Sequence, residues 1–298
     1  GRTLREVEPV KPAELDALME ASYACFRQWR TAPFAERADV LRAVARRLRD
    51  NVEELAPIMT EEMGKPIKEA RGEVNKAAWA AEHYAEHAEA YLAAEELPSD
   101  ATRSYVQYLP LGPVLGVLPW NAPFWLAFRF GSPALMAGNT VVMKHDPHTP
   151  RCGQAIAQLF DDVGAPAGLF QNLPMETPDV EAAIRHPRIQ AVSFTGSSKG
   201  GAAVAAIAAS EIKPTVLELG GSDPAIVLAD ANLEEAADAI VLSRIINAGQ
   251  SCIAAKRILV EEAVHDRFAG LLQERLAKLK VGDPREESTD VGPLARED

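Results

Sequence analysis

Two short runs carry side chains capable of covalent and proton-transfer chemistry. Residues 249–252 (Gly-Gln-Ser-Cys) end in Cys252, and residues 218–221 (Glu-Leu-Gly-Gly) begin with Glu218. A cysteine thiolate is a strong nucleophile near neutral pH, and a partly desolvated carboxylate can take a proton from water. The alternative for Cys252 is a place in the core, because unpaired cysteines pack as small hydrophobes. Glu218 interrupts an apolar strand pattern, which is costly for a carboxylate without a partner or a role.

Two further residues can bind oxygen atoms of a reacting substrate. Asn121, in the run Pro-Trp-Asn-Ala-Pro at 119–123, can present its side-chain amide to an oxyanion. Arg129 lies in an otherwise apolar segment, where a buried guanidinium requires an anion and a carboxylate matches its geometry. An internal ion pair with an acidic residue is the alternative for Arg129.

Two other features could bind an anion. Residues 194–201 (Phe-Thr-Gly-Ser-Ser-Lys-Gly-Gly) join a strand pattern to an alanine-rich helix pattern, so helix N–H groups and the Ser197 hydroxyl can bind a phosphate. The GxGxxG and Walker patterns are absent, and an ordinary helix cap is an equal alternative. Lys144 ends an apolar strand pattern, at the edge where ligands of open α/β sheets bind. Its alternative is a lysine that extends into solvent.

The other cysteines and histidines form no recognisable site. Cys25 and Cys152 lack surroundings like those of Cys252, and we expect them to be structural. Three scattered cysteines argue against a disulfide framework and a metal site, and they favour a reducing cytoplasm. His83 and His87 have the spacing of a metal-binding pair, but no acidic or cysteine pattern accompanies them. We expect a solvated helix face there.

The order of the hydrophobic patterns predicts an α/β fold. Residues 12–95 predict two or three long helices, with breaks at 64–66 and 98–99. From residue 104 onward strands alternate with helices, which is typical of a parallel sheet covered by helices. The expected strands are 104–109, 114–119, 140–144, 190–194, 215–219, 225–228 and 258–260, the expected helices are 151–163, 198–209, 233–246 and one reaching residue 280, and 281–298 is expected to be a loop-like tail.

Length and composition limit the classes of function. The 298 residues suffice for two domains, and the net charge of −12 argues against a general nucleic-acid surface. The apolar run 112–138 contains prolines and Arg129, which would interrupt a membrane-spanning helix. We therefore expect buried strand and loop there, and neither a nucleic-acid nor a membrane partner.

Together and in order, these motifs resemble the aldehyde dehydrogenase superfamily, from about residue 12 to the end of the chain. The succinate-semialdehyde dehydrogenase-like members are the most similar. The resemblance rests on Pro-Trp-Asn-Ala-Pro at 119–123, Lys144 after its strand, Phe-Thr-Gly-Ser at 194–197, Glu-Leu-Gly-Gly at 218–221 and Gly-Gln-Ser-Cys at 249–252, with Lys-His-Asp-Pro at 144–147, Gly-Ser-Asp-Pro at 221–224 and Gly-Asp-Pro-Arg at 282–285 for the narrower group.

The resemblance implies NAD(P)-dependent oxidation of an aldehyde to a carboxylic acid, with succinate semialdehyde as the expected substrate. Cys252 would attack the aldehyde to give a thiohemiacetal and then a thioester. Asn121 and the Cys252 N–H would hold the oxyanion, and Glu218 would activate the water that releases the acid. Arg129 would grip the substrate's carboxylate. Some relatives have a second arginine six residues before the nucleophile, where this chain has Ile246.

The resemblance also implies a dinucleotide site. The residues expected to form it are Trp120, Asn121, Lys144, Pro147, Gly196, Ser197, Leu219 and Gly220. NAD-preferring relatives often place an acidic residue three positions after the lysine, where this chain has Pro147, with Asp146 one residue earlier. The choice between NAD and NADP therefore stays open.

The resemblance implies two domains and an assembly. We expect a Rossmann-like dinucleotide-binding domain at 1–216, with an oligomerisation hairpin near 98–111, and an incomplete α/β catalytic domain at 217–298. Relative to the family the chain is expected to be truncated at both ends, chiefly the C-terminus, and the full-length form to be a cytoplasmic homodimer or homotetramer. Two other functions stay open: an inactive dinucleotide-binding fragment with a structural or interaction role, and a cysteine hydrolase that cleaves esters through Cys252.

Overall fold

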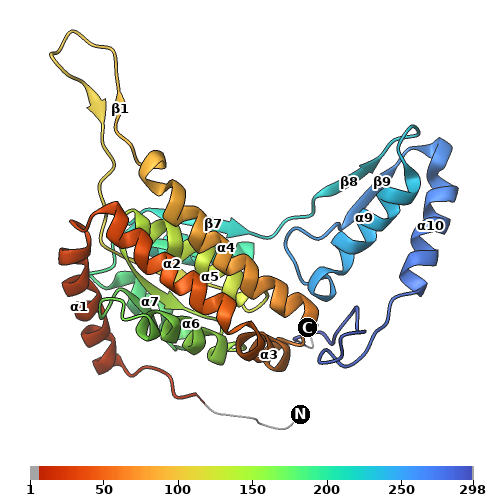
Figure 1. The fold of residues 1–298 in the computed structure, drawn as a ribbon, viewed down its shortest axis with the longest axis horizontal. Helices are drawn as coiled ribbons and strands as arrows, with labels where there is room; N and C mark the ends of the chain where they lie inside the picture. Colours follow the sequence, from red (N-terminus) through yellow and green to blue (C-terminus); the bar gives the residue numbers. More distant parts are fainter. Residues whose placement is uncertain (1–6, 297–298) are drawn as a thin grey trace. The chain divides into compact units, whose positions relative to one another are not determined.

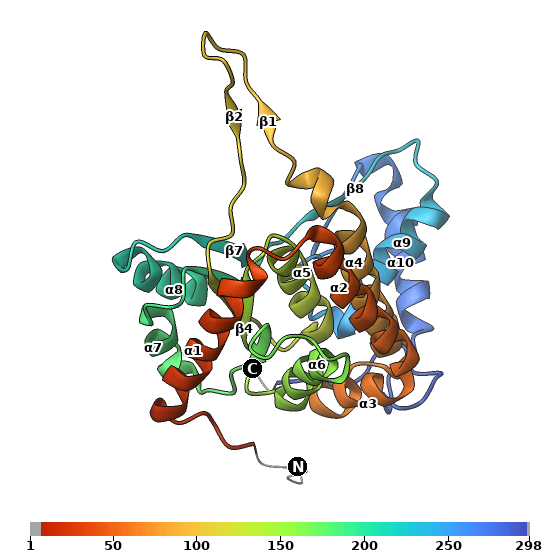
Figure 2. The same ribbon diagram turned by 60° about the vertical axis from the view of Figure 1, so that its left-hand side comes forward.

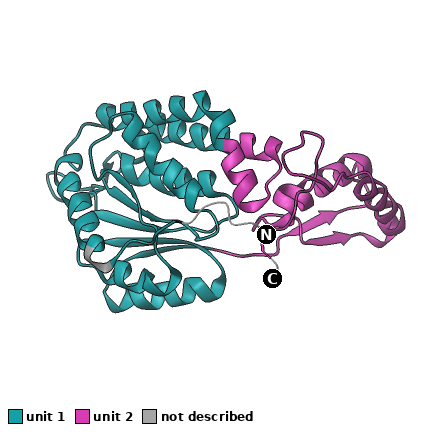
Figure 3. Cartoon of the chain, turned by 90° about the horizontal axis from the view of Figure 1, so that it is seen from below, with its two compact units in different colours: residues 1–55, 73–218 teal, residues 56–72, 219–298 magenta. Residues whose placement is uncertain are grey.

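The computed structural model describes residues 7–296, and the chain runs through them as traced in Figure 1. It divides into two compact units: Gly1–Leu55 with Glu73–Glu218, and Ala56–Gly72 with Leu219–Asp298 (Figure 3). This division places residues 56–72 with the C-terminal part, and its other boundary lies two residues from the predicted one at 216/217. The assignment of functional domains to 1–216 and 217–298 stays a prediction.

Residues 12–91, all of them described, form four helices, so the prediction of two or three was too low. Two breaks were not predicted: residues 30–33, and Asn51, which leaves the helical conformation for a single residue that a periodicity argument does not register. The predicted break at 64–66 is confirmed, and the apolar face of the second helix is buried as predicted. The helices are α1 (Pro12–Trp29), α2 (Phe34–Asp50), α3 (Val52–Met63) and α4 (Ile67–Tyr91).

A five-stranded sheet with the order β5-β4-β3-β6-β7 forms the centre of the first unit. The registered pairs β3–β4, β3–β6 and β4–β5 are parallel, so the predicted α/β class with a Rossmann-like sheet is confirmed. The strands are β3 (Pro113–Val117), β4 (Thr140–Lys144), β5 (Phe170–Asn172), β6 (Ala191–Gly196) and β7 (Thr215–Leu219). The sequence did not predict β5 or the short helix α7 (Val180–Arg185), because three to six residues are too few for a periodic pattern.

The strand order reverses between β3 and β6, which is the point where open α/β sheets bind ligands at their carboxyl ends. The register shows which residues meet there. Val117, the last residue of β3, lies opposite Lys144 of β4 on one side and opposite Phe194 of β6 on the other. Segments leaving these three strands therefore start from the same edge.

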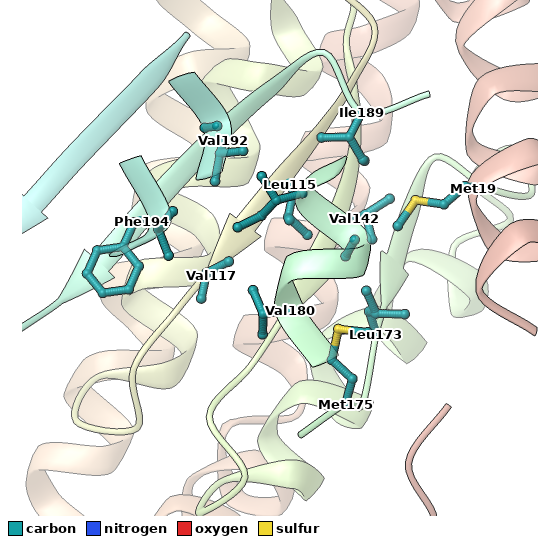
Figure 4. Packing of buried hydrophobic residues seen from close by; sticks show 14 of the residues in the cluster. Met19, Leu115, Val117, Val142, Leu173, Met175, Val180, Ile189, Val192 and Phe194 are labelled. Carbon is teal, nitrogen blue, oxygen red and sulfur yellow. The ribbon is translucent and has the colours of Figure 1, made fainter. Parts of the chain in front are cut away.

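Helices cover both faces of this sheet. On one face α1, α7 and α8 (Ser198–Ser210) pack on a cluster that includes Met19, Leu115, Val142 and Val192 (Figure 4). Gly116 faces the opposite side, since side chains alternate along a strand. A Cβ there would lie 2.3 Å from Cε1 of Phe130 in α5 (Pro123–Met136), so glycine lets this helix approach the strand closely. Residues 112–138 thus contain a strand and then a helix, and the prediction of strand and loop for this run missed the helix.

The prolines of α5 explain that error. Pro123 stands in the first turn, where its missing N–H costs nothing, and Pro133 lies inside the helix without ending it. Within the described part of the chain, no helix combines the length and apolar character needed to cross a bilayer. The next helix, α6 (Pro150–Asp162), confirms the one predicted at 151–163.

A small hairpin of the first unit consists of β1 (Glu95–Glu96) and β2 (Tyr105–Val106), which pair antiparallel (Figure 2). The strand predicted at 104–109 is thus only two residues long, and both hairpin strands are exposed. Its role in oligomerisation stays a prediction.

The second unit contains two parallel strands, β8 (Pro224–Val227) and β9 (Arg257–Val260). Helices α9 (Leu233–Ile245) and α10 (His265–Ala277) pack with these strands around a separate core that includes Val227, Ile240 and Phe268. Beyond α10 the described tail is loop, with one bridge between Val281 and Val291, as predicted.

Candidate active site

The carboxyl edge of the sheet gathers five of the predicted residues. Trp120 and Asn121 follow β3 and are half-buried, Lys144 ends β4, and Gly196 and Ser197 join β6 to α8. Because β3 pairs with both β4 and β6, these segments leave the sheet side by side.

Lys144 is buried at this edge, with only 4% of its surface exposed, so the alternative of a lysine extending into solvent is wrong. Burial lowers the pKa of its ammonium, and the carboxylates of Asp146 and Glu176 act in the opposite direction. A buried ammonium is stabilised by hydroxyl, carboxylate or phosphate oxygens. Pro147, in contrast, lies exposed in the turn after β4.

His145, which the sequence reasoning missed, links this edge to the start of α5. Its Nε2 lies 3.1 Å from the Pro123 carbonyl and therefore donates to it, while Nδ1 accepts from the Asp146 N–H at 3.3 Å. The ring is fully buried, and desolvation lowers its pKa to about 4. A neutral histidine thus holds the residues after Lys144 against the segment that follows Asn121.

Ser197 caps α8: its Oγ accepts the N–H of Gly200 at 3.1 Å. The helix cap, which was one of the two predicted alternatives, is therefore confirmed. It is compatible with the other alternative, a phosphate site, because a helix of 13 residues still presents first-turn N–H groups and its positive dipole end. A Cβ at Gly200 would lie 2.8 Å from Cζ of Phe194, so glycine keeps this turn tight.

Glu218 and Arg129 form an ion pair, with 2.8 Å between Glu218 Oε1 and Arg129 Nη2. Their side chains are 47% and 39% exposed, so the predicted burial of both was wrong. For Glu218 the reason is that β7 is the edge strand of the sheet and most of it is exposed. The alternative predicted for Arg129, an ion pair with an acidic residue, is the arrangement present.

A second missed residue fixes the helix that carries Arg129. The carboxylate of Glu73 in α4 accepts the N–H groups of Phe124 at 2.9 Å and Trp125 at 3.2 Å. It is buried at the N-terminus of α5, where a negative charge is favourable. No local signal marks this contact, because the partners are about fifty residues apart.

Cys252 lies in the second unit and is exposed, so the alternative of a core cysteine is wrong. The short helical turn η2 (Ile246–Gly249) precedes it. Asn247 and Ala248 adopt left-handed backbone conformations there, at φ 53° and 55°, which are strained for residues other than glycine. Gly249, at φ 80°, adopts the same region at no steric cost.

Hydrogen bonds within the second unit hold this strained turn in place. The Asn247 N–H donates to the Glu69 carboxylate at 2.7 Å, and Gln250 Oε1 accepts the Ala295 N–H at 3.0 Å. Lys256 Nζ donates to the carbonyls of Cys252 at 2.7 Å and Ser251 at 3.0 Å. The backbone around Cys252 is therefore fixed while its thiol remains accessible. Glu69 and Lys256 were not predicted, since nothing in their local sequence marks them.

The predicted residues divide between the units. Glu218 belongs to the first unit together with the residues at the sheet edge, whereas Leu219, Gly220 and Cys252 belong to the second. Leu219 and Gly220 are exposed at the end of β7. Among the described residues, no group of three or more His, Cys, Asp or Glu side chains could hold a metal ion.

The whole chain, residues 1–298, matches the model of the aldehyde dehydrogenase family. It is 46% identical over 298 residues to a probable succinate-semialdehyde dehydrogenase [NADP(+)] of Synechocystis, covering all of this chain and 66% of that protein. It is also 46% identical over 303 residues to a succinate-semialdehyde dehydrogenase [NADP(+)] of Mycobacterium avium, covering all of this chain and 64% of that protein.

Solved structures agree with these sequence matches. A crystal structure of succinic semialdehyde dehydrogenase from Streptococcus pyogenes, in complex with NADP+ as the cofactor, superposes with a TM-score of 0.95 at 35% identity. The match covers 98% of this chain and 65% of that one. The chain thus spans about two thirds of the length of the curated relatives it matches.

Proposed function

The chain belongs to the aldehyde dehydrogenase family, and from this premise we propose that it oxidises succinate semialdehyde to succinate with NADP as the hydride acceptor. The observation that carries the proposal is the sheet edge. Lys144 and the β6–α8 turn lie on either side of β3 at the point where the strand order reverses. The preference for NADP is proposed from the names of the relatives.

The residues at this edge fit a dinucleotide. The first turn of α8, beginning after Ser197, suits a pyrophosphate, and the buried ammonium of Lys144 suits ribose hydroxyls or a phosphate. Trp120, Gly196 and the segment at Leu219 and Gly220 would complete the site. When bound, NADP supplies the acceptor for the hydride that leaves the substrate.

Cys252 provides the covalent chemistry of the proposal. Its thiolate sulfur forms a bond with the aldehyde carbon, and the Asn121 amide together with the Cys252 N–H stabilises the negative oxygen that results. After oxidation the acyl group is held on the sulfur as a thioester. Glu218 then takes a proton from water while the water oxygen bonds to the acyl carbon, and the carbon–sulfur bond breaks to release the acid and the thiolate.

Arg129 supplies the preference for a substrate with a carboxylate. A guanidinium can bind a carboxylate through two parallel N–H···O bonds, and Arg129 already binds one carboxylate in this structure. The ion pair with Glu218 supports this role, because it places a carboxylate against the Arg129 guanidinium.

An assay of the expressed chain tests the proposal. Absorbance of the reduced nicotinamide should rise only when aldehyde and NADP are both present, and it should not rise with the Cys252→Ser variant. Binding of NADP without turnover on any aldehyde would contradict the proposal and favour an inactive dinucleotide-binding protein. Ester cleavage without cofactor, in the absence of hydride transfer, would favour a cysteine hydrolase. The cytoplasmic location and the homo-oligomeric state remain predictions.

A further inference from the structure

The ion pair between Arg129 and Glu218 joins two residues to which the proposed function gives separate tasks. Arg129 is on α5 and Glu218 is on β7, almost ninety residues apart in the sequence, and both belong to the first unit. As long as Glu218 occupies Arg129, one oxygen of the proposed base is bound to the group that is meant to receive the substrate's carboxylate. The two tasks therefore compete for one contact.

We propose that this ion pair is a latch, in which the carboxylate of the substrate displaces Glu218 from Arg129 and so releases Glu218 to act as the base. The proposal rests on the proposed function and deepens it. Arg129 would be a specificity-determining residue that acts on the release of product through Glu218, in addition to binding the substrate.

The ion pair between Arg129 and Glu218 is weak enough for another carboxylate to replace Glu218. Both side chains are more than a third exposed, and ion pairs in that environment contribute little net stability. An incoming carboxylate can offer two parallel hydrogen bonds to the guanidinium in place of the ion pair, in which Oε1 contacts Nη2. One anion replaces another, so the guanidinium is never left without a counter-charge.

The two sides of the latch differ in how firmly they are held. The N-terminus of α5 is fixed by the buried carboxylate of Glu73, and Trp125 of the same helix stacks under the ammonium of Lys76 at 4.1 Å. Glu218, in contrast, lies on the exposed edge strand of the sheet. When the pair opens, Arg129 stays in position on its helix, and the glutamate side chain is the part that moves.

A consequence follows for substrates that lack a carboxylate. They can react with a nucleophile, but they leave Glu218 on Arg129, so the step that needs the base stays slow. Substrate binding can release Glu218 only if the substrate binds better when the Arg129–Glu218 pair is separated than when it is formed. In this proposal only a substrate with a carboxylate does so. Discrimination should therefore appear in kcat as well as in KM.

Calorimetric titration of succinate into the expressed chain tests the latch without any need for turnover. Glu218→Gln removes the competitor and should tighten succinate binding about two- to fivefold, the range expected for displacing an exposed ion pair. Arg129→Gln should abolish binding. Glu211→Gln, which removes a carboxylate paired with Arg185 elsewhere in the same unit, is the matched control and should leave the affinity unchanged. Unchanged or weaker binding by Glu218→Gln, or no succinate binding by any form, would overturn the latch.

A kinetic comparison uses succinate semialdehyde and butyraldehyde, which has the same number of carbons and no carboxylate. Arg129→Gln should raise kcat for butyraldehyde, because Glu218 is released, and should raise KM for succinate semialdehyde. Glu211→Gln, the matched control outside the site, should leave kcat for butyraldehyde at the wild-type value. A fall in kcat for butyraldehyde in Arg129→Gln would contradict the proposal. If succinate binds as expected but no aldehyde is oxidised, the proposed function fails and the competition for Arg129 stands.

Discussion

The sheet edge of the first unit and the Cys252 turn of the second hold reactive groups in opposite ways. At the edge, Lys144 and His145 are buried and fixed by regular structure, and both are shifted toward their neutral forms. At the turn, the thiol is exposed and the backbone beneath it is strained but fixed by hydrogen bonds from Glu69 and Lys256.

The difference is consistent with the roles proposed for the two regions. A group that binds a ligand gains strength from a desolvated, preorganised position, because charge interactions are strongest where water is excluded. A nucleophile must be reached by its substrate, so its side chain cannot be packed away. Burial at the edge therefore carries a desolvation cost, while the turn carries backbone strain on the order of 1–3 kcal/mol for each of its non-glycine left-handed residues, Asn247 and Ala248.

The largest expected effect separates chemistry from stability at the turn. Cys252→Ala should lower kcat for aldehyde oxidation by at least about a thousandfold, because no other nucleophile is proposed. It should change the free energy of unfolding by less than about 0.5 kcal/mol, because the side chain is exposed. The checks are steady-state rates and urea unfolding. Residual activity within tenfold of the wild type would contradict the assigned role.

One contribution to the pH dependence of stability should come from His145 at the buried edge. His145 has a folded-state pKa of about 4 against a usual 6.5, so below pH 6.5 the unfolded state binds the proton more readily. The contribution of His145 to the free energy of unfolding is fully present above pH 6.5. It is lost progressively as the pH falls to about 4, by about 3 kcal/mol in total.

The measurement is urea unfolding followed by tryptophan fluorescence between pH 4 and 7.5, because all four tryptophans lie in the first unit. His145→Gln keeps an N–H donor for the Pro123 carbonyl and cannot be protonated in this range, so it is the matched control. Equal slopes for the two proteins would show that His145 does not titrate as described.

Lys144→Met tests whether the edge trades stability for binding. The variant should bind NADP about 10- to 100-fold more weakly, which is the usual value of a charge-assisted hydrogen bond. Its free energy of unfolding should stay the same or rise by up to about 1 kcal/mol, because a buried ammonium no longer has to be desolvated. Fluorescence titration measures the affinity for NADP, and urea unfolding measures the free energy of unfolding. A loss of stability with unchanged NADP binding would assign Lys144 a structural role.

The smallest effect concerns the support of the turn. Lys256→Met removes the donors to the carbonyls of Cys252 and Ser251 but keeps the length of the side chain. It should lower kcat about three- to tenfold by loosening the position of the thiol, a cost of about 1 kcal/mol. Lys278→Met, which removes an exposed lysine paired with Glu274 on α10, should have no effect on kcat. Equal effects of the two variants would mean that the contacts of Lys256 do not position Cys252.

The parts of the fold that could be predicted are those whose signals are local. The buried strand ending at Lys144, the helix capped by Ser197 and the tail after α10 were predicted because a run of neighbouring residues contains the pattern. Cys252, Glu218 and Asn121 were likewise proposed from short motifs, and their roles stay predictions. The three-residue β5, the extra break at Asn51 and the helix over Pro133 were missed, because they are too short or run against a local rule.

The sequence by itself determined the α/β order of elements, the family and the residues that could carry the chemistry. Only the tertiary structure decided the state in which those residues are found. It brought Glu218 onto Arg129, placed Glu73 at the start of α5 and buried His145 beside Lys144. Each of these contacts joins separate elements, or depends on how deeply an element is covered. Burial, charge pairing and strand-edge exposure are properties of the packed chain, so no short stretch of sequence contains them.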